Sequence, residues 1–64
     1  MKLTRLSGEC KEGTCPTVYL SDRGTLVLQG DVVHGVDGLV IGQREQAVEL
    51  SIALVREAIR ELGE

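Results

Sequence analysis

Aromatic side chains are almost missing from this chain of 64 residues, which has one Tyr and no Phe or Trp. Its interior must therefore come from small aliphatic side chains, of which Leu, Val and Ile contribute twenty. A core in a chain this short rarely supplies more than about 3–5 kcal/mol of net stability without a disulfide, a metal or a second subunit. The composition predicts one domain that is completed by association, with little scaffold left for a catalytic cleft.

The charge balance argues against a protein that binds nucleic acid by itself. Seven basic and ten acidic residues give a net charge of −3, whereas affinity for DNA or RNA comes largely from neutralised phosphates. No stretch approaches the 18 apolar residues of a membrane-spanning helix, and the first six residues lack the apolar region of a signal peptide. We therefore expect a cytoplasmic protein with no membrane segment and no cofactor.

Residues 17–29 have the pattern of an antiparallel hairpin. Two runs of β-forming residues, 17–20 and 25–29, flank a Ser-Asp-Arg-Gly segment that favours a turn. Aliphatic side chains fall on both faces of the second run, so we expect that strand to be covered on both sides. Gly30 suggests a bend or bulge directly after it.

The end of the sequence has the pattern of an amphipathic helix over residues 52–62. Ser51 is a suitable N-cap and Gly63 is a typical stop signal. Apolar residues recur at spacings of three and four, and charged residues occupy the opposite face. A helix of about three turns needs a surface to dock on, and the hairpin is the nearest apolar surface.

These patterns predict a small α+β fold: an antiparallel sheet of about three strands with one C-terminal helix, completed by dimerisation. We expect residues 17–64 to form this single domain. Residues 1–16 are predicted to be an N-terminal arm that carries both cysteines, with a short edge strand over 2–6 as an alternative. The aliphatic surplus exceeds what one sheet–helix contact can cover, which predicts a homodimer or larger assembly.

Two groups of residues are candidates for contacts with other chains. Aliphatic side chains of the two hairpin strands and of an apolar triplet are expected in the interface between copies: Val18, Leu26, Val27, Leu28, Leu39, Val40 and Ile41. Charged side chains beside the turn and on the outer helix face are the candidate contacts with a partner protein: Arg23, Arg56, Glu57, Arg60 and Glu61. We assign no catalytic residue, since the single His34 has no recognisable nucleophile motif beside it.

Cys10 and Cys15 form a C-x₄-C pair with three interpretations. Free thiols are the favoured one, because the cytoplasm keeps thiols reduced. A disulfide is the second, and closing so short a loop would add roughly 2 kcal/mol of stability. A zinc site is the third, although one chain has too few ligands unless two chains pool their four thiolates.

The run from Cys15 to Gly30 resembles short actinobacterial proteins of the BldB-like kind. In these proteins a Cys-Pro-x-[Val/Ile]-Tyr segment leads into Asp-Arg-Gly-Thr and then an aliphatic strand ending in Gln-Gly. Residues 47–58 are similar to their C-terminal strand and helix. The resemblance implies a small self-associating cytoplasmic protein that accompanies a helix-turn-helix regulator in developmental gene control. Residues 31–45 are shorter here, so no partner contact in that region is implied.

The first functional hypothesis is therefore a non-enzymatic homodimeric accessory protein of transcriptional regulation that acts by binding another protein. One alternative is direct DNA binding by a dimeric β–α module, because residues 46–63 are similar to the strand–helix half of AbrB-type swapped-hairpin folds. The second hairpin of those folds is missing, and basic residues are few. The other alternative is a metal- or thiol-responsive switch at Cys10 and Cys15.

Overall fold

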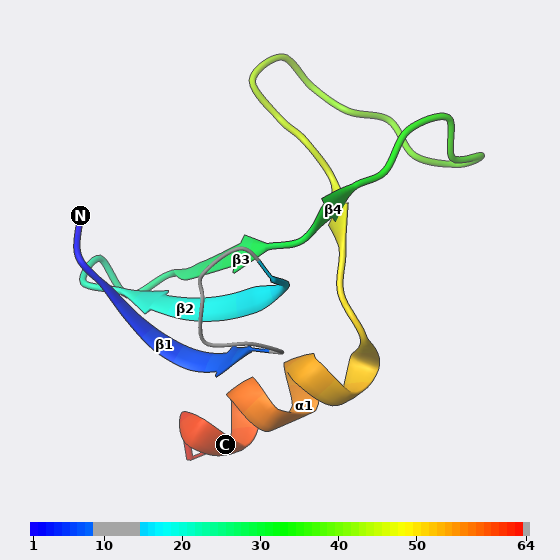
Figure 1. Cartoon of the computed structure of the whole chain (residues 1–64). Helices are drawn as coiled ribbons and strands as arrows, with labels where there is room; N and C mark the ends of the chain where they lie inside the picture. Colours follow the sequence, from blue (N-terminus) through cyan, green and yellow to red (C-terminus); the bar gives the residue numbers. More distant parts are fainter. Residues whose placement is uncertain (9–14, 64) are drawn as a thin grey trace.

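The computed structural model describes residues 1–8 and 15–63. Its elements follow the chain in this order: β1 (Leu3–Gly8), β2 (Thr17–Ser21), β3 (Leu26–Gln29), β4 (Asp31–Val32), β5 (Val48–Glu49) and α1 (Ile52–Glu61). The first three strands form an antiparallel sheet in the order β1-β2-β3, and β4 pairs with β5 in a separate ladder. Figure 1 shows the sheet and α1 as one body, from which the chain between β3 and α1 projects. The predicted three-stranded α+β fold with a C-terminal helix is confirmed.

The hairpin of β2 and β3 is closed by Ser21. Its backbone N–H donates to the Thr25 carbonyl oxygen at 2.9 Å. Its buried hydroxyl accepts hydrogen bonds from the backbone N–H groups of Arg23 and Thr25, at 3.1 and 3.2 Å. Gly24 has a φ of +76°, a conformation that disfavours residues with a Cβ. The Ser-Asp-Arg-Gly segment therefore forms the expected turn. The Ser21 hydroxyl accepts hydrogen bonds from its backbone, and Gly24 adopts the positive φ that the turn requires.

Strand β1 differs from the predicted N-terminal arm. Leu3–Gly8 pairs antiparallel with β2, and the register shifts between Arg5 and Ser7, which marks a β-bulge. The boundary at residue 16 is therefore wrong, because these residues belong to the sheet of the main domain. The alternative of a short edge strand over 2–6 agrees better with β1, although the strand extends to Gly8. The pattern favoured an arm because the one buried side chain of β1 is that of Ser7 and not an aliphatic group.

Helix α1 begins and ends as its sequence predicts. The Ser51 side chain accepts a hydrogen bond from the Leu54 backbone N–H at 3.1 Å, which satisfies one donor of the first turn. Gly63 follows the last residues of the helix with a φ of +84°. Leu54 and Ala58, one turn apart, are buried and define the face that docks on the sheet.

The helix packs on β1 and on β2, so the predicted docking on the hairpin is confirmed for its first strand, and β1 supplies the rest of the surface. A buried hydrogen bond from the Ser7 hydroxyl to the Leu54 carbonyl oxygen, 2.8 Å long, joins β1 to α1. Val18 lies opposite Ser7 in the sheet and is only 1% exposed. It is therefore a core residue, and its prediction as an interface residue is wrong. The described part of the chain has no helix with the length and hydropathy to cross a membrane.

Candidate functional site

Most large aliphatic side chains of this protein lie at its surface. Within residues 1–8 and 15–63, the buried apolar residues are Val18, Leu54 and Ala58, whereas twelve large apolar side chains are exposed. Such a small interior leaves many aliphatic side chains in contact with water. Exposed apolar patches of this kind mark interaction sites. Two surfaces carry the candidate interface residues, and each is built by a different part of the fold.

The first surface is the hairpin arm, defined as residues 31–49, which projects away from the sheet and α1 (Figure 1). Its ends are held by the short β4–β5 ladder and by a hydrogen bond from the Val33 N–H to the Ala47 carbonyl oxygen, 3.0 Å long. Beyond these bonds the arm exposes a run of aliphatic side chains: Val36, Leu39, Val40 and Ile41. Val40 is 93% exposed. The predicted triplet 39–41 is thus available for contact, in a loop and not in a strand.

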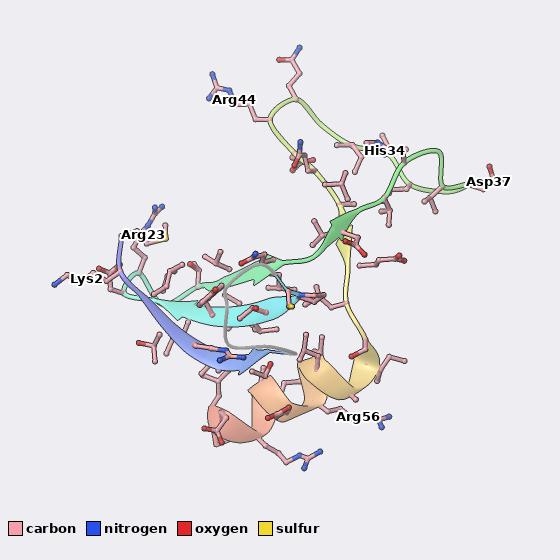
Figure 2. All side chains as sticks on the ribbon, viewed as in Figure 1. Lys2, Arg23, His34, Asp37, Arg44 and Arg56 are labelled. Atoms are coloured by element: carbon pink, nitrogen blue, oxygen red, sulfur yellow. The ribbon has the colours of Figure 1, made fainter. Side chains whose placement is uncertain are left out.

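The arm also has a shaped groove and one well-defined turn. The groove has a volume of about 300 Å³ and is lined by residues from both sides of the arm: Val32, Val33, His34, Ile41, Glu45, Gln46 and Ala47. In the turn, the Gly42 N–H donates to the Glu45 side chain at 2.8 Å, and the Glu45 N–H donates back to the Gly42 carbonyl oxygen at 3.2 Å. Figure 2 places His34, Asp37 and Arg44 on the arm, far from the body.

The second surface is the β3 edge, defined as Leu26, Val27 and Leu28. Leu26 pairs with Leu20 and Leu28 pairs with Val18, so both leucines lie on the sheet face that α1 covers at β1 and β2. The helix packs mainly against β1 and β2, and Leu26 and Leu28 remain 46% and 42% exposed. Val27 is half-buried on the opposite face. The expected coverage of this strand on both sides is therefore not provided within one chain.

The charged candidates do not form a single patch. Arg23 lies in the β2–β3 turn, at the end of the body remote from Arg56 on α1 (Figure 2). Glu57, Arg60 and Glu61 are exposed on the same helix. The helix therefore offers a surface of mixed charge, and Arg23 would need a separate contact.

Cys15 is in a disulfide in this structure. The favoured interpretation as a free thiol is therefore wrong for Cys15, and the disulfide alternative holds for this residue. Cys10, the only other cysteine of the sequence, lies outside the described residues. The Thr17 hydroxyl donates to the Cys15 carbonyl oxygen at 2.6 Å, which fixes the backbone where it enters β2. The described residues contain no group of three or more His, Cys, Asp or Glu arranged to hold a metal.

The arm joins the body at a close contact that sequence reasoning did not find. A Cβ added to Gly30 would lie 2.5 Å from the Glu49 carbonyl oxygen, so only glycine lets the two backbones approach this closely. The adjacent Asp31 and Glu49 are opposite each other in the β4–β5 ladder. With Pro16, Leu50 and Ser51 they line a depression of about 380 Å³. Gly30 was the signal in the sequence, because it predicted a bend. The sequence did not show that this bend would bring Gly30 against Glu49.

The chain is less compact than a folded monomer of its size. Its accessible surface is 5226 Å², against about 4,000 Å² for a monomeric protein of the same mass. Its Cα radius of gyration is 12.6 Å, against about 10.7 Å for a compact domain of this length. The protruding arm and the small core together leave an excess of about 1,200 Å² of surface.

No protein-family model, curated protein or solved structure matches this chain. The BldB-like resemblance of residues 15–30 and 47–58 therefore stays a prediction.

Proposed function

We propose that this chain is a non-enzymatic, self-associating interaction module that acts by binding other proteins. The observation that carries the proposal is the excess of about 1,200 Å² of accessible surface over that of a compact monomer. A standard protein–protein interface buries about 800 Å² on each partner. The excess is about one and a half times the area that one such interface removes from each partner, and the exposed aliphatic side chains supply its apolar content.

The hairpin arm is the proposed site for a different protein, which moves Leu39, Val40 and Ile41 from the predicted interface between copies to the partner site. It exposes aliphatic side chains around Val40 beside a groove, and few backbone hydrogen bonds hold it, so a partner would supply the contacts that its own chain does not. The proposed partner is a regulatory protein such as a helix-turn-helix factor, and the proposed setting is transcriptional or developmental regulation in the cytoplasm. This more specific part of the proposal is supported by the BldB-like resemblance.

Two measurements test the proposal. The native mass of the purified chain at micromolar concentration should equal at least two chains, and a cooperatively melting monomer would contradict self-association. A tagged chain isolated from its host should retain a stoichiometric partner, and Val40→Asp should release it. The matched control is Gln43→Asp, which places the same charge on an exposed polar position of the arm and should leave the partner bound. Equal retention by Val40→Asp would contradict the role of the arm.

A thiol-responsive switch is the second candidate, and the disulfide at Cys15 favours it. Reduction would release the covalent constraint just before β2, where the Thr17 hydroxyl holds the Cys15 backbone. In this case Cys15→Ser should mimic the reduced protein and change self-association or partner binding. A variant that behaves as the parent in both assays would rule the switch out.

A further inference from the structure

Strand β3 has an outer edge whose hydrogen-bonding groups can be assigned. It is a terminal strand of the three-stranded sheet. The bond from the Ser21 N–H to the Thr25 carbonyl oxygen identifies these two residues as a hydrogen-bonded pair. Bonded and non-bonded pairs alternate along an antiparallel ladder, so Val27 bonds to β2. The N–H and C=O groups of Leu26 and Leu28 therefore point away from the sheet.

The two edges of this sheet differ in their protection against pairing. Strand β1 carries a β-bulge between Arg5 and Ser7, and a bulge and a charged side chain both discourage a second strand from joining. Strand β3 reads Leu-Val-Leu-Gln, without a charge or a proline, and its pairing with β2 has no register shift. A regular apolar edge of this kind is a template for another strand. The occupant favoured by these features is a strand without charge, which a second copy of β3 provides.

We propose that two copies of this chain pair antiparallel through β3, about a two-fold axis at Val27, to form one six-stranded sheet. This inference rests on the proposed self-association and gives its geometry. In this register Leu26 of each copy is opposite Leu28 of the other. Each such pair exchanges two backbone hydrogen bonds, so four bonds satisfy all the outward groups of Leu26 and Leu28. The arrangement is self-complementary, as a two-fold interface requires.

The side chains fit the same register. Leu26 and Leu28 lie on the sheet face that carries α1, so the four leucines of two copies would cluster between the two helices. This cluster covers the leucines that one chain leaves 46% and 42% exposed. On the opposite face the two Val27 side chains meet at a non-bonded pair, where Cα atoms are about 4.5 Å apart. Both faces of β3 then gain apolar neighbours, which is the coverage that its sequence predicts.

Leu28→Pro tests the backbone pairing. Proline removes the Leu28 N–H, which β2 does not use, and proline is tolerated in edge strands where that group faces outward. By symmetry the dimer loses two of its four hydrogen bonds. Each bond changes the dissociation constant about fivefold, so this constant should rise about 30-fold or more. The control is Leu28→Thr, which keeps the N–H and should weaken the dimer less than proline. Mass photometry or sedimentation over a dilution series measures both.

Val27→Cys tests the axis and does not depend on whether the proline variant folds. Cysteines across a non-bonded pair lie within disulfide range, so mild oxidation should give a covalent dimer whose peptide map joins residue 27 to residue 27. Val40→Cys, on the more exposed arm, should not cross-link in this way. If the wild type is a dimer, but Val27→Cys forms no 27–27 link and Leu28→Pro keeps the dimer mass, β3 pairing is overturned and the contact lies on the arm or another surface. A monomeric wild type would instead overturn the proposed self-association itself.

Discussion

Replacing Gly30 by Ala should loosen the hairpin arm while leaving the sheet and α1 folded. The new Cβ would lie 2.5 Å from the Glu49 carbonyl oxygen and 3.3 Å from Leu50 Cγ. A Cβ needs at least about 3.0 Å from such an atom, and the obstacle is backbone, so β4 and β5 must move apart by about half an ångström. Overpacking of this kind costs about 1–3 kcal/mol.

The cost should appear mainly in the arm. The ladder that would have to open is two residue pairs long, and each of its hydrogen bonds contributes only about 0.5–1.5 kcal/mol net. Opening the β4–β5 ladder therefore costs no more free energy than keeping the strained contact. The Val33 N–H, which donates to the Ala47 carbonyl oxygen, reports this opening. Its hydrogen exchange should accelerate by about 5- to 150-fold, which is 1–3 kcal/mol expressed as an opening constant.

Hydrogen exchange followed by NMR at fixed protein concentration measures this effect. The Ser21 N–H, bonded to Thr25 within the other sheet, should keep its parent rate. Gly8→Ala is the control substitution, because the three atoms nearest to its Cβ belong to the end of the Arg5 side chain and not to the backbone. It should leave the exchange of the Val33 N–H unchanged. Parent-like protection of Val33 in Gly30→Ala would refute the close approach of the two backbones at this position.

Other substitutions test the body of the fold. Leu54→Ala, at the centre of the helix–sheet contact, should lower the free energy of unfolding by about 2–5 kcal/mol, and a parent-like urea midpoint would contradict the described core. Ser7→Ala removes the hydroxyl bonded to the Leu54 carbonyl and should cost about 1 kcal/mol in the same assay. Ser51→Ala removes the helix cap and should cost about 1 kcal/mol, with Ser51→Asp as the variant that restores the parent value. Cys15 should resist a thiol reagent until the protein is reduced, and immediate labelling would contradict the disulfide.

Local patterns predicted the hairpin and helix because each is specified by neighbouring residues. The turn depends on Ser21 and Gly24, and the helix ends depend on Ser51 and Gly63, all of which act on their own backbone or on residues a few positions away. The apolar triplet 39–41 was recognised as surplus for the same reason, because hydrophobicity is a property of the residues themselves. These are the parts of a fold that a sequence read by itself can define.

Long-range pairing was not predictable in the same way. Ser7 occupies the buried position of strand β1, and its hydroxyl donates to the Leu54 carbonyl oxygen, 47 residues away in the sequence. A polar residue gives no sign of burial until that acceptor is known. Val18 was misassigned for the matching reason, since an aliphatic residue on a strand looks the same whether it faces a helix or another chain. The contact of Gly30 with Glu49 likewise joins residues whose meeting depends on how the arm folds back.

The hydrogen bond between Ser7 and Leu54 has a consequence for the folding of this protein during its synthesis on the ribosome. The buried contact of β1 with α1 joins segments that are synthesised at different times. The nascent β2–β3 hairpin therefore lacks its helix until translation has passed Ala58. Contacts of such wide sequence separation form slowly. During that interval the helix does not cover Val18, so the nascent hairpin exposes an apolar side chain that the folded protein buries.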